Sequence, residues 1–215
     1  MEIYDTEEEQ LEALKRWWKE NGQSAIIGLI VGIAIILGWN YWNEHKSDQA
    51  NQASALYDQL LKAVAADQKD SAEKLAERLQ EQFKSTEYAA YSSLLQAKIK
   101  LEKGDMPAAK TILEKLAGVP NEEISNIAKI RLVRLMMAKG EFEPALQLIN
   151  DIDPAKFSNF SGNYDELVGD LYVALDRLDQ ARSSYQKAIE NGYKSPLLQL
   201  KIDDLTAPEK VEKSK

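Results

Sequence analysis

The longest apolar stretch of the sequence runs from Ala25 to Trp42 (AIIGLIVGIAIILGWNYW). No charged residue occurs between Asn21 and Asn43, whereas the segments on both sides are polar. An α-helix rises about 1.5 Å per residue, so this stretch extends roughly 27 Å, close to the ~30 Å hydrocarbon core of a bilayer. The pattern therefore predicts a membrane-spanning helix over residues 23–43, between an N-terminal tail (residues 1–22) and a larger polar region.

A cleaved signal peptide and a buried helix of a soluble domain are the alternatives to this anchor. A cleaved signal requires a basic start and small residues at the cleavage site. Here the tail is net acidic, and bulky aromatic residues follow the apolar run. Aromatic residues flank it on both sides, as at bilayer interfaces: Trp17 and Trp18 before it, and Trp39, Tyr41 and Trp42 after it. The pattern favours an uncleaved signal-anchor helix in contact with membrane lipid.

Basic residues near the ends of the anchor predict its orientation. Lys15, Arg16 and Lys19 precede the span, and only Lys46 follows it before Lys62. Because flanking Lys and Arg residues stay in the cytoplasm, we expect the N-terminus to be cytoplasmic and the larger region to lie outside the cytoplasm.

Within the anchor, Gly28 and Gly32 form a GxxxG pattern, which allows two membrane helices to approach closely. We expect this pair to be a packing face toward another membrane helix. The alternative is that these glycines are merely the ordinary small residues of membrane helices.

The sequence of the tail predicts one amphipathic helix over residues 1–20. Thr6 and Glu9 have the spacing of a capping box, and Leu11, Leu14, Trp17 and Trp18 recur at helical intervals. The only histidine, His45, follows the anchor. Without a cysteine or a second histidine it is interpreted as an interfacial polar residue and not as a metal ligand.

Beyond Gln52 the apolar positions recur with the 3.6-residue period of helices, and no segment alternates as a strand does. The fold class predicted is therefore all-α. Helices are expected at about residues 49–66, 71–83, 86–103, 106–117, 122–139, 142–150, 163–176, 178–191 and 195–204.

These helices repeat with a period of 36 residues. Gly104, Gly140 and Asp176 coincide at turn positions, where a left-handed backbone conformation can end the first helix of a pair. Ala109, Ala145 and Ala181 coincide in the second helix, where a small side chain permits close packing. Pro107 and Pro144 lie early in second helices, where a missing N–H is tolerated.

The repeats resemble the tetratricopeptide repeat, whose usual period is about 34 residues. The last repeat matches best, through Gly169, Tyr172, Ala181, Tyr185 and Ala188, although the usual tryptophan is absent throughout. The resemblance implies an α-solenoid of about four helical hairpins over residues 44–206. Residues 207–215 are polar and are expected to be a frayed C-terminus.

Such arrays bind proteins or peptides along a concave groove. By resemblance, the groove-lining positions of the three first helices are Tyr91, Leu94, Lys98 and Leu101; Ile127, Ile130, Arg134 and Met137; and Asn163, Glu166, Asp170 and Val173. Lys98, Arg134 and Asp170 share one position, which predicts two cations and an anion along the groove floor. Some of the apolar members could instead pack against a neighbouring helix.

Composition excludes several classes of function. A net charge of −8 disfavours a nucleic-acid partner, and the absence of cysteine excludes disulfides and thiolate chemistry. The nucleotide-binding, serine-hydrolase and zinc-protease motifs are absent. We therefore expect no catalytic, cofactor-binding or metal-binding residues, and a protein that is not an enzyme.

The whole chain resembles the YfgM family, the ancillary subunits of the bacterial SecYEG translocon. The likeness lies in the opening MEIY, in EALKRWWKENG, in GWNYWNEH at the end of the anchor, and in the repeats. It implies a single-pass inner-membrane protein with a periplasmic repeat domain that associates with SecYEG and with PpiD, a membrane-anchored periplasmic chaperone. The implied role is to pass translocating or newly translocated proteins to periplasmic chaperones.

Two other functions are compatible with the residues alone. The chain could be a membrane-tethered repeat scaffold for another envelope complex, or a regulator that acts through its cytoplasmic tail.

Overall fold

The computed structural model describes residues 7–153 and 161–205, and within these ranges every regular element is an α-helix. The helices are α1 (Glu7–Ala65), α2 (Lys69–Gln82), α3 (Glu87–Glu102), α4 (Met106–Ala117), α5 (Glu122–Ala138), α6 (Phe142–Asn150), α7 (Ser161–Ala174), α8 (Leu178–Glu190) and α9 (Pro196–Asp204). The all-α prediction is confirmed.

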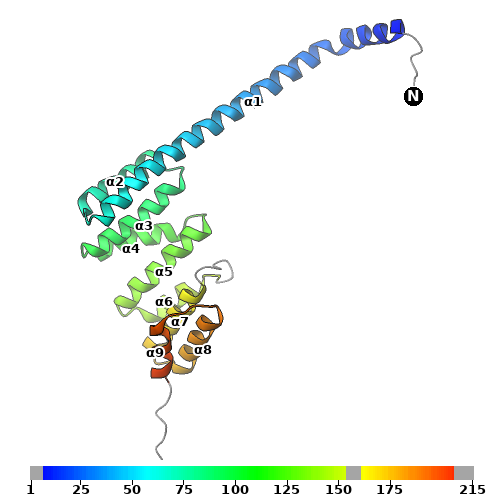
Figure 1. Cartoon of the computed structure of the whole chain (residues 1–215). Coiled ribbons are helices and arrows are strands. Elements are labelled where there is room, and N and C mark those ends of the chain that lie inside the picture. The colour runs from blue at the N-terminus through cyan, green and yellow to red at the C-terminus, as the bar shows by residue number, and fades with distance from the viewer. Residues whose placement is uncertain (1–6, 154–160, 206–215) are drawn as a thin grey trace, which may run out of the picture. The chain divides into compact units, whose positions relative to one another are not determined.

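The chain divides into two compact units, one ending at Ser54 and one beginning at Ala55. The described part of the first unit belongs entirely to α1, which continues without a break for 59 residues (Figure 1). The sequence predicted a tail helix, an anchor and a further helix as successive segments. They join because no proline interrupts residues 7–65, so each N–H can bond to the preceding turn. Thr6, the predicted capping residue, lies outside the described residues.

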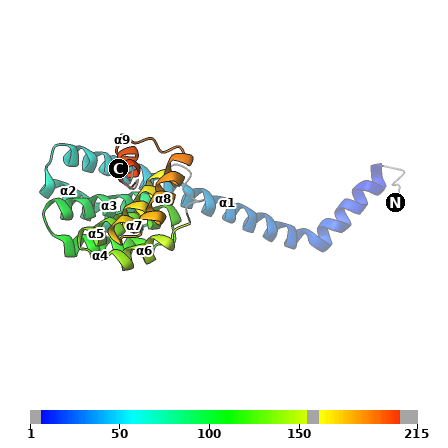
Figure 2. The ribbon, with the colours of Figure 1, turned by 90° about the horizontal axis from the view of Figure 1, so that it is seen from below.

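The second unit is a stack of helical hairpins. From α2 to α9 each helix contacts the next one along the chain, and Figure 1 shows these helices following one another in chain order. In Figure 2, seen from below, the same helices overlap. Helices α3/α4, α5/α6 and α7/α8 form the three pairs related by the 36-residue period. These three pairs are preceded by the last part of α1 and by α2, and they are followed by α9. The predicted repeat array is confirmed.

The turns within the pairs have the conformation that their residues predict. Gly104, Gly140 and Asp176 have φ values of 81°, 75° and 57°. At the first turn the Gly104 N–H donates to the Leu101 carbonyl at 2.9 Å, and the Asp105 N–H donates to the Lys100 carbonyl at 2.8 Å. This hydrogen-bond pair is a Schellman motif, which satisfies the last carbonyls of the helix.

The aligned alanines lie at the contact of paired helices. Ala109, Ala145 and Ala181 are all fully buried, as is Ala72 at the corresponding place in α2. A larger side chain at these positions would push the two helices apart, so the small residue sets the interhelical distance. The reason for the alanine period is therefore packing.

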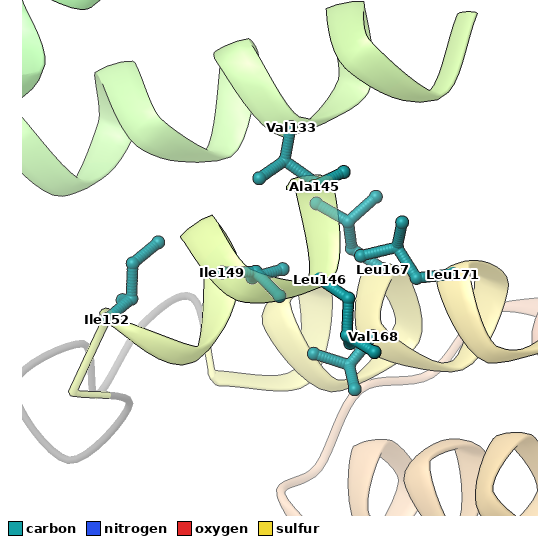
Figure 3. Close-up of a cluster of buried hydrophobic side chains, with 8 residues drawn as sticks. All are labelled: Val133, Ala145, Leu146, Ile149, Ile152, Leu167, Val168 and Leu171. Carbon is teal, nitrogen blue, oxygen red and sulfur yellow. The ribbon is translucent and has the colours of Figure 1, made fainter. Parts of the chain in front are cut away.

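The core continues from one hairpin to the next. One cluster joins α5, α6 and α7, and Figure 3 shows its side chains converging between these helices. Its members are Val133, Ala145, Leu146, Ile149, Ile152, Leu167, Val168 and Leu171. A second cluster joins α3, α4 and α5, including Leu94, Leu113 and Ile124. Because the clusters share partly buried neighbours such as Met136, the repeats stabilise one another.

Candidate functional site

The predicted groove positions on α3 separate into buried and exposed side chains. Leu94 is 4% exposed and belongs to the core between α3, α4 and α5, so it does not line a groove. Tyr91 is half-buried, with its ring 6.3 Å from that of Tyr57. Lys98 is exposed and has an ion pair with Glu102 one turn later, at 3.6 Å. Only part of the predicted α3 surface is therefore accessible to a partner.

Helix α5 places its predicted cation beside an open cavity. Arg134 is exposed, whereas Ile127, Ile130 and Met137 are half-buried and pack against the two cores. The cavity has a volume of about 400 Å³. It is lined by Ala97, Lys98 and Leu101 from α3, Met106 and Leu113 from α4, and Arg131, Arg134, Leu135 and Ala138 from α5.

Helix α7 has its predicted groove carboxylates bound by the last helix. The Nζ atom of Lys201, on α9, donates to Glu166 at 2.9 Å and to the two carboxylate oxygens of Asp170 at 2.7 and 2.9 Å. The hydroxyl of Tyr185 also donates to Asp170, at 2.7 Å, and the Lys201 ammonium lies 5.7 Å from the centre of that tyrosine ring. We name Glu166, Asp170, Tyr185 and Lys201 the α9 clasp.

The three charged residues that share one repeat position, Lys98, Arg134 and Asp170, therefore have different environments. Lys98 and Arg134 line the same cavity. Asp170 takes part in the α9 clasp, so its charge is already compensated within the chain. Asn163 is half-buried in the first part of α7, and Val173 is exposed near its end. The exposed cations at predicted groove positions, Lys98 and Arg134, therefore lie on the first two repeats.

Two important residues were not singled out from the sequence. Lys201 lies 35 residues after Glu166, so it has nearly the same repeat position on α9, but α9 was predicted only as a short final helix. Arg131 lies at a repeat position that is apolar in the neighbouring repeats, where Leu95 and Leu167 are 36 residues before and after it. Both residues can be found in the sequence when the 36-residue repeat is extended to α9 and each position is compared between repeats.

The buried acid Asp165 is hydrogen-bonded to another side chain of the array. Its Oδ2 atom accepts a hydrogen bond from the Asn191 side-chain amide at 2.6 Å, and burial raises the pKa of its carboxyl. Within residues 7–153 and 161–205 no three His, Cys, Asp or Glu side chains are grouped to hold a metal ion. The cavity between α3, α4 and α5 presents apolar side chains and the charges of Lys98, Arg131 and Arg134.

The first unit exposes an apolar helix surface. α1 is long and apolar enough to cross a membrane, and only 6% of its most apolar window is buried. Ile30 and Leu37 are 60% and 63% exposed. A Cβ atom added at Gly28 or Gly32 would meet no atom within 4 Å, so neither glycine is required by packing inside the chain. The packing face predicted at Gly28 and Gly32 stays a prediction.

Alkaline pH should destabilise the α9 clasp. Burial lowers the pKa of Lys201, but its bonds to Asp170 and Glu166 outweigh this and raise the pKa overall. Burial, together with the bond to Asp170, raises the pKa of Tyr185. Both groups hold protons in the folded state at pH values where the unfolded chain has lost them. The stability that these two raised pKa values contribute is therefore fully present below about pH 10 and is lost as the pH rises further.

The measurement is thermal unfolding of the full chain followed by circular dichroism at increasing pH. Tyr185→Phe should make the alkaline loss of stability shallower, because one of the two titrating groups of the α9 clasp is gone. An equally steep loss in this variant would contradict the contribution of Tyr185.

Comparison with known proteins agrees with this architecture. Residues 15–207 match the family described as a tetratricopeptide repeat-like domain. Among solved structures, PilF of Pseudomonas aeruginosa superimposes with a TM-score of 0.64 at 13% identity, over 73% of this chain and 68% of that one. MamA of Desulfovibrio magneticus gives a TM-score of 0.58 at 14% identity, over 73% and 85%. At this level of identity these structures show the repeat fold.

Relatives of known class match over nearly the whole chain. A protein of Haemophilus influenzae is 32% identical over 206 residues, covering 94% of this chain and 99% of the relative. One of Escherichia coli is 30% identical over 210 residues, covering 96% and 100%. Both are named ancillary SecYEG translocon subunit. The matches include the apolar segment and the repeats together, and the chain therefore belongs to the family of ancillary SecYEG translocon subunits.

Proposed function

We propose that this protein is a non-catalytic adaptor, anchored in the bacterial inner membrane, that associates with the SecYEG translocon. It passes newly translocated proteins to periplasmic chaperones and associates with a chaperone of the PpiD type. The observation that carries the proposal is the correspondence with the relatives over 94–96% of this chain. A chain matched in both its anchor and its repeats has the parts needed for a translocon subunit that also binds proteins.

The proposed orientation places the N-terminus in the cytoplasm and the repeat array in the periplasm. Lys15, Arg16 and Lys19 before the span, against Lys46 after it, support this topology. The array would then meet translocated chains as they emerge from the membrane. Its binding surface in this proposal comprises the accessible groove positions, above all Lys98 and Arg134, and excludes the buried Leu94.

The anchor is proposed to contact a membrane helix through Gly28 and Gly32. Both glycines lie open on α1, and lipid offers no hydrophobic drive for helix association, so close backbone packing must supply the contact energy. Isoleucine at these positions would hold the partner helix away without making the anchor less apolar.

Affinity recovery of the full chain from native membranes tests the proposal. We expect the wild-type protein to recover Sec components and a PpiD-type chaperone. Gly28→Ile combined with Gly32→Ile should reduce recovery of Sec components about fivefold, which corresponds to roughly 1 kcal/mol of lost helix packing. Gly38→Ile is the matched control, because Gly38 is equally open but lies on another face of the helix.

The outcomes separate the two parts of the proposal. If the wild-type protein recovers no Sec component, association with the translocon is wrong. If the paired isoleucine variant recovers as much as Gly38→Ile, the glycine face is not the contact, and the translocon is bound elsewhere.

A further inference from the structure

The cavity between α3, α4 and α5 has mostly apolar walls. Leu113 and Leu135 belong to the adjoining core, and Leu101, Met106 and Ala138 continue the apolar surface outward. Its volume of about 400 Å³ exceeds the ~300 Å³ at which ligand pockets begin. Met106 is 42% exposed although it lies at this cavity. The cavity therefore offers apolar area that the folded chain itself leaves uncovered.

Three cations surround these apolar walls. Lys98, Arg131 and Arg134 all line the cavity. Lys98 has a loose ion pair with Glu102, but among the described residues no carboxylate lies within 4.0 Å of either arginine. Arg131 directs one N–H to the Leu94 carbonyl at 2.7 Å, and burial together with the charge of Arg134 lowers its pKa. An anion would relieve the repulsion between these like charges.

The arginine at position 131 is a local departure from the repeat. The equivalent residues, Leu95 on α3 and Leu167 on α7, are leucines, and Leu167 lies in the apolar core. At Arg134 the equivalent residue of the next repeat is Asp170, which is compensated by Lys201. The pair of uncompensated arginines is therefore particular to this cavity, whereas the other hairpins follow the shared packing pattern.

We infer that the cavity between α3, α4 and α5 binds an acidic–apolar segment of another protein chain, with an apolar side chain against Leu101 and Met106 and a neighbouring carboxylate between Lys98 and Arg134. Arginine binds carboxylates through two parallel N–H bonds, and apolar walls strengthen such pairs by excluding water. The inference deepens the proposed function and rests on it for the view that this surface binds proteins.

A short acidic peptide segment matches the charge of this cavity better than a nucleic acid does. The chain carries a net charge of −8, so a nucleic acid would be repelled outside this small cationic cluster. One or two carboxylates match a cluster of three cations whose charge is local. An anionic lipid or fatty acid has the same charge and apolar character, and the experiment must distinguish it from a peptide.

The test uses the full chain in nanodiscs of zwitterionic phosphatidylcholine. The probe is a fluorescein-labelled peptide, Gly-Ser-Leu-Glu-Leu-Glu-Ser-Gly, whose binding is measured by fluorescence anisotropy. We expect saturable binding that weakens about tenfold when both Glu are replaced by Gln or both Leu by Ser, because each change removes one half of the recognition. Arg134→Glu should weaken binding at least as much.

Two further variants make the result specific. Lys84→Glu changes the net charge equally at an exposed site that does not line the cavity, and it should bind like the wild type. Ala138→Phe should reduce binding by filling the cavity without altering charge. Circular dichroism confirms that each variant is folded, and Arg131 is left unchanged because its hydrogen bond also joins α3 to α5.

Absence of peptide binding, equal binding of the Gln peptide, or equal binding by Arg134→Glu and Lys84→Glu would overturn the inference. Binding of fluorescent laurate in place of the peptide, sensitive to Ala138→Phe, would also overturn it in favour of a lipid. Peptide binding by a protein that recovers no Sec component would support this inference while contradicting the proposed function.

Discussion

Replacing Gly169 with alanine should lower the free energy of unfolding by about 3 kcal/mol. Gly169 on α7 faces the ring of Tyr185 on α8, and an added Cβ atom would overlap two carbons of that ring. The ring cannot easily move aside, since Tyr185 is 2% exposed and its hydroxyl is held by Asp170. Relief of the overlap must therefore separate the two helices.

Thermal or urea unfolding of the full chain measures this effect, and Gly118→Ala is the matched control. At Gly118 the added Cβ would have one ordinary contact, 3.8 Å from the Lys115 carbonyl, and φ is −98°. That substitution should change stability by less than about 1 kcal/mol. If Gly169→Ala is no more destabilising than the control, the contact of α7 with α8 is not as close as described.

Lys201→Glu should destabilise the C-terminal hairpin by about 2 kcal/mol. The substitution removes the ammonium that compensates Glu166 and Asp170 and places a third carboxylate beside them. The side chains of Glu166 and Lys201 are only 14% and 25% exposed, so solvent screens the repulsion incompletely. Loss of the α9 clasp should release α9 from α7 and α8.

Hydrogen exchange of the full chain should report this change as faster exchange in α7, α8 and α9, with α3 and α4 unaffected. Lys194→Glu makes the same charge change at an exposed residue outside the α9 clasp and should leave exchange unaltered. Equal exchange in the two variants would show that the ion pairs of Lys201 contribute no stability.

The α9 clasp also limits where a partner can bind. Glu166 and Asp170 have groove positions in the repeat pattern, but their charges are used within the chain. Lys98, which has one loose ion pair with Glu102, lines the cavity between α3, α4 and α5 together with Arg131 and Arg134. A partner recognised by charge is therefore expected at the first two repeats, and substitutions there should affect binding more than stability.

The helices of the array, their pairing and the family were predictable from the sequence, whereas the continuity of α1 from the tail through the anchor was not. Apolar spacing is a local property of the chain, so it revealed both the anchor and the array. The turn conformations at Gly104, Gly140 and Asp176 were predictable because φ preference belongs to the residue. The burial of Ala109, Ala145 and Ala181 followed from the repeat, since equivalent positions pack equivalently.

Which of the predicted groove residues are exposed depends on how the helices pack, and the sequence does not give this. Leu94 and Lys98 are one helical turn apart and share the predicted surface, yet the first is buried because α4 and α5 pack over it. Asp170 is compensated by Lys201 from a helix 31 residues away, and Arg131 reaches the carbonyl of Leu94, 37 residues earlier. Charge compensation and cavity formation depend on residues distant in the chain, whereas periodicity reports only the helix on which a residue lies.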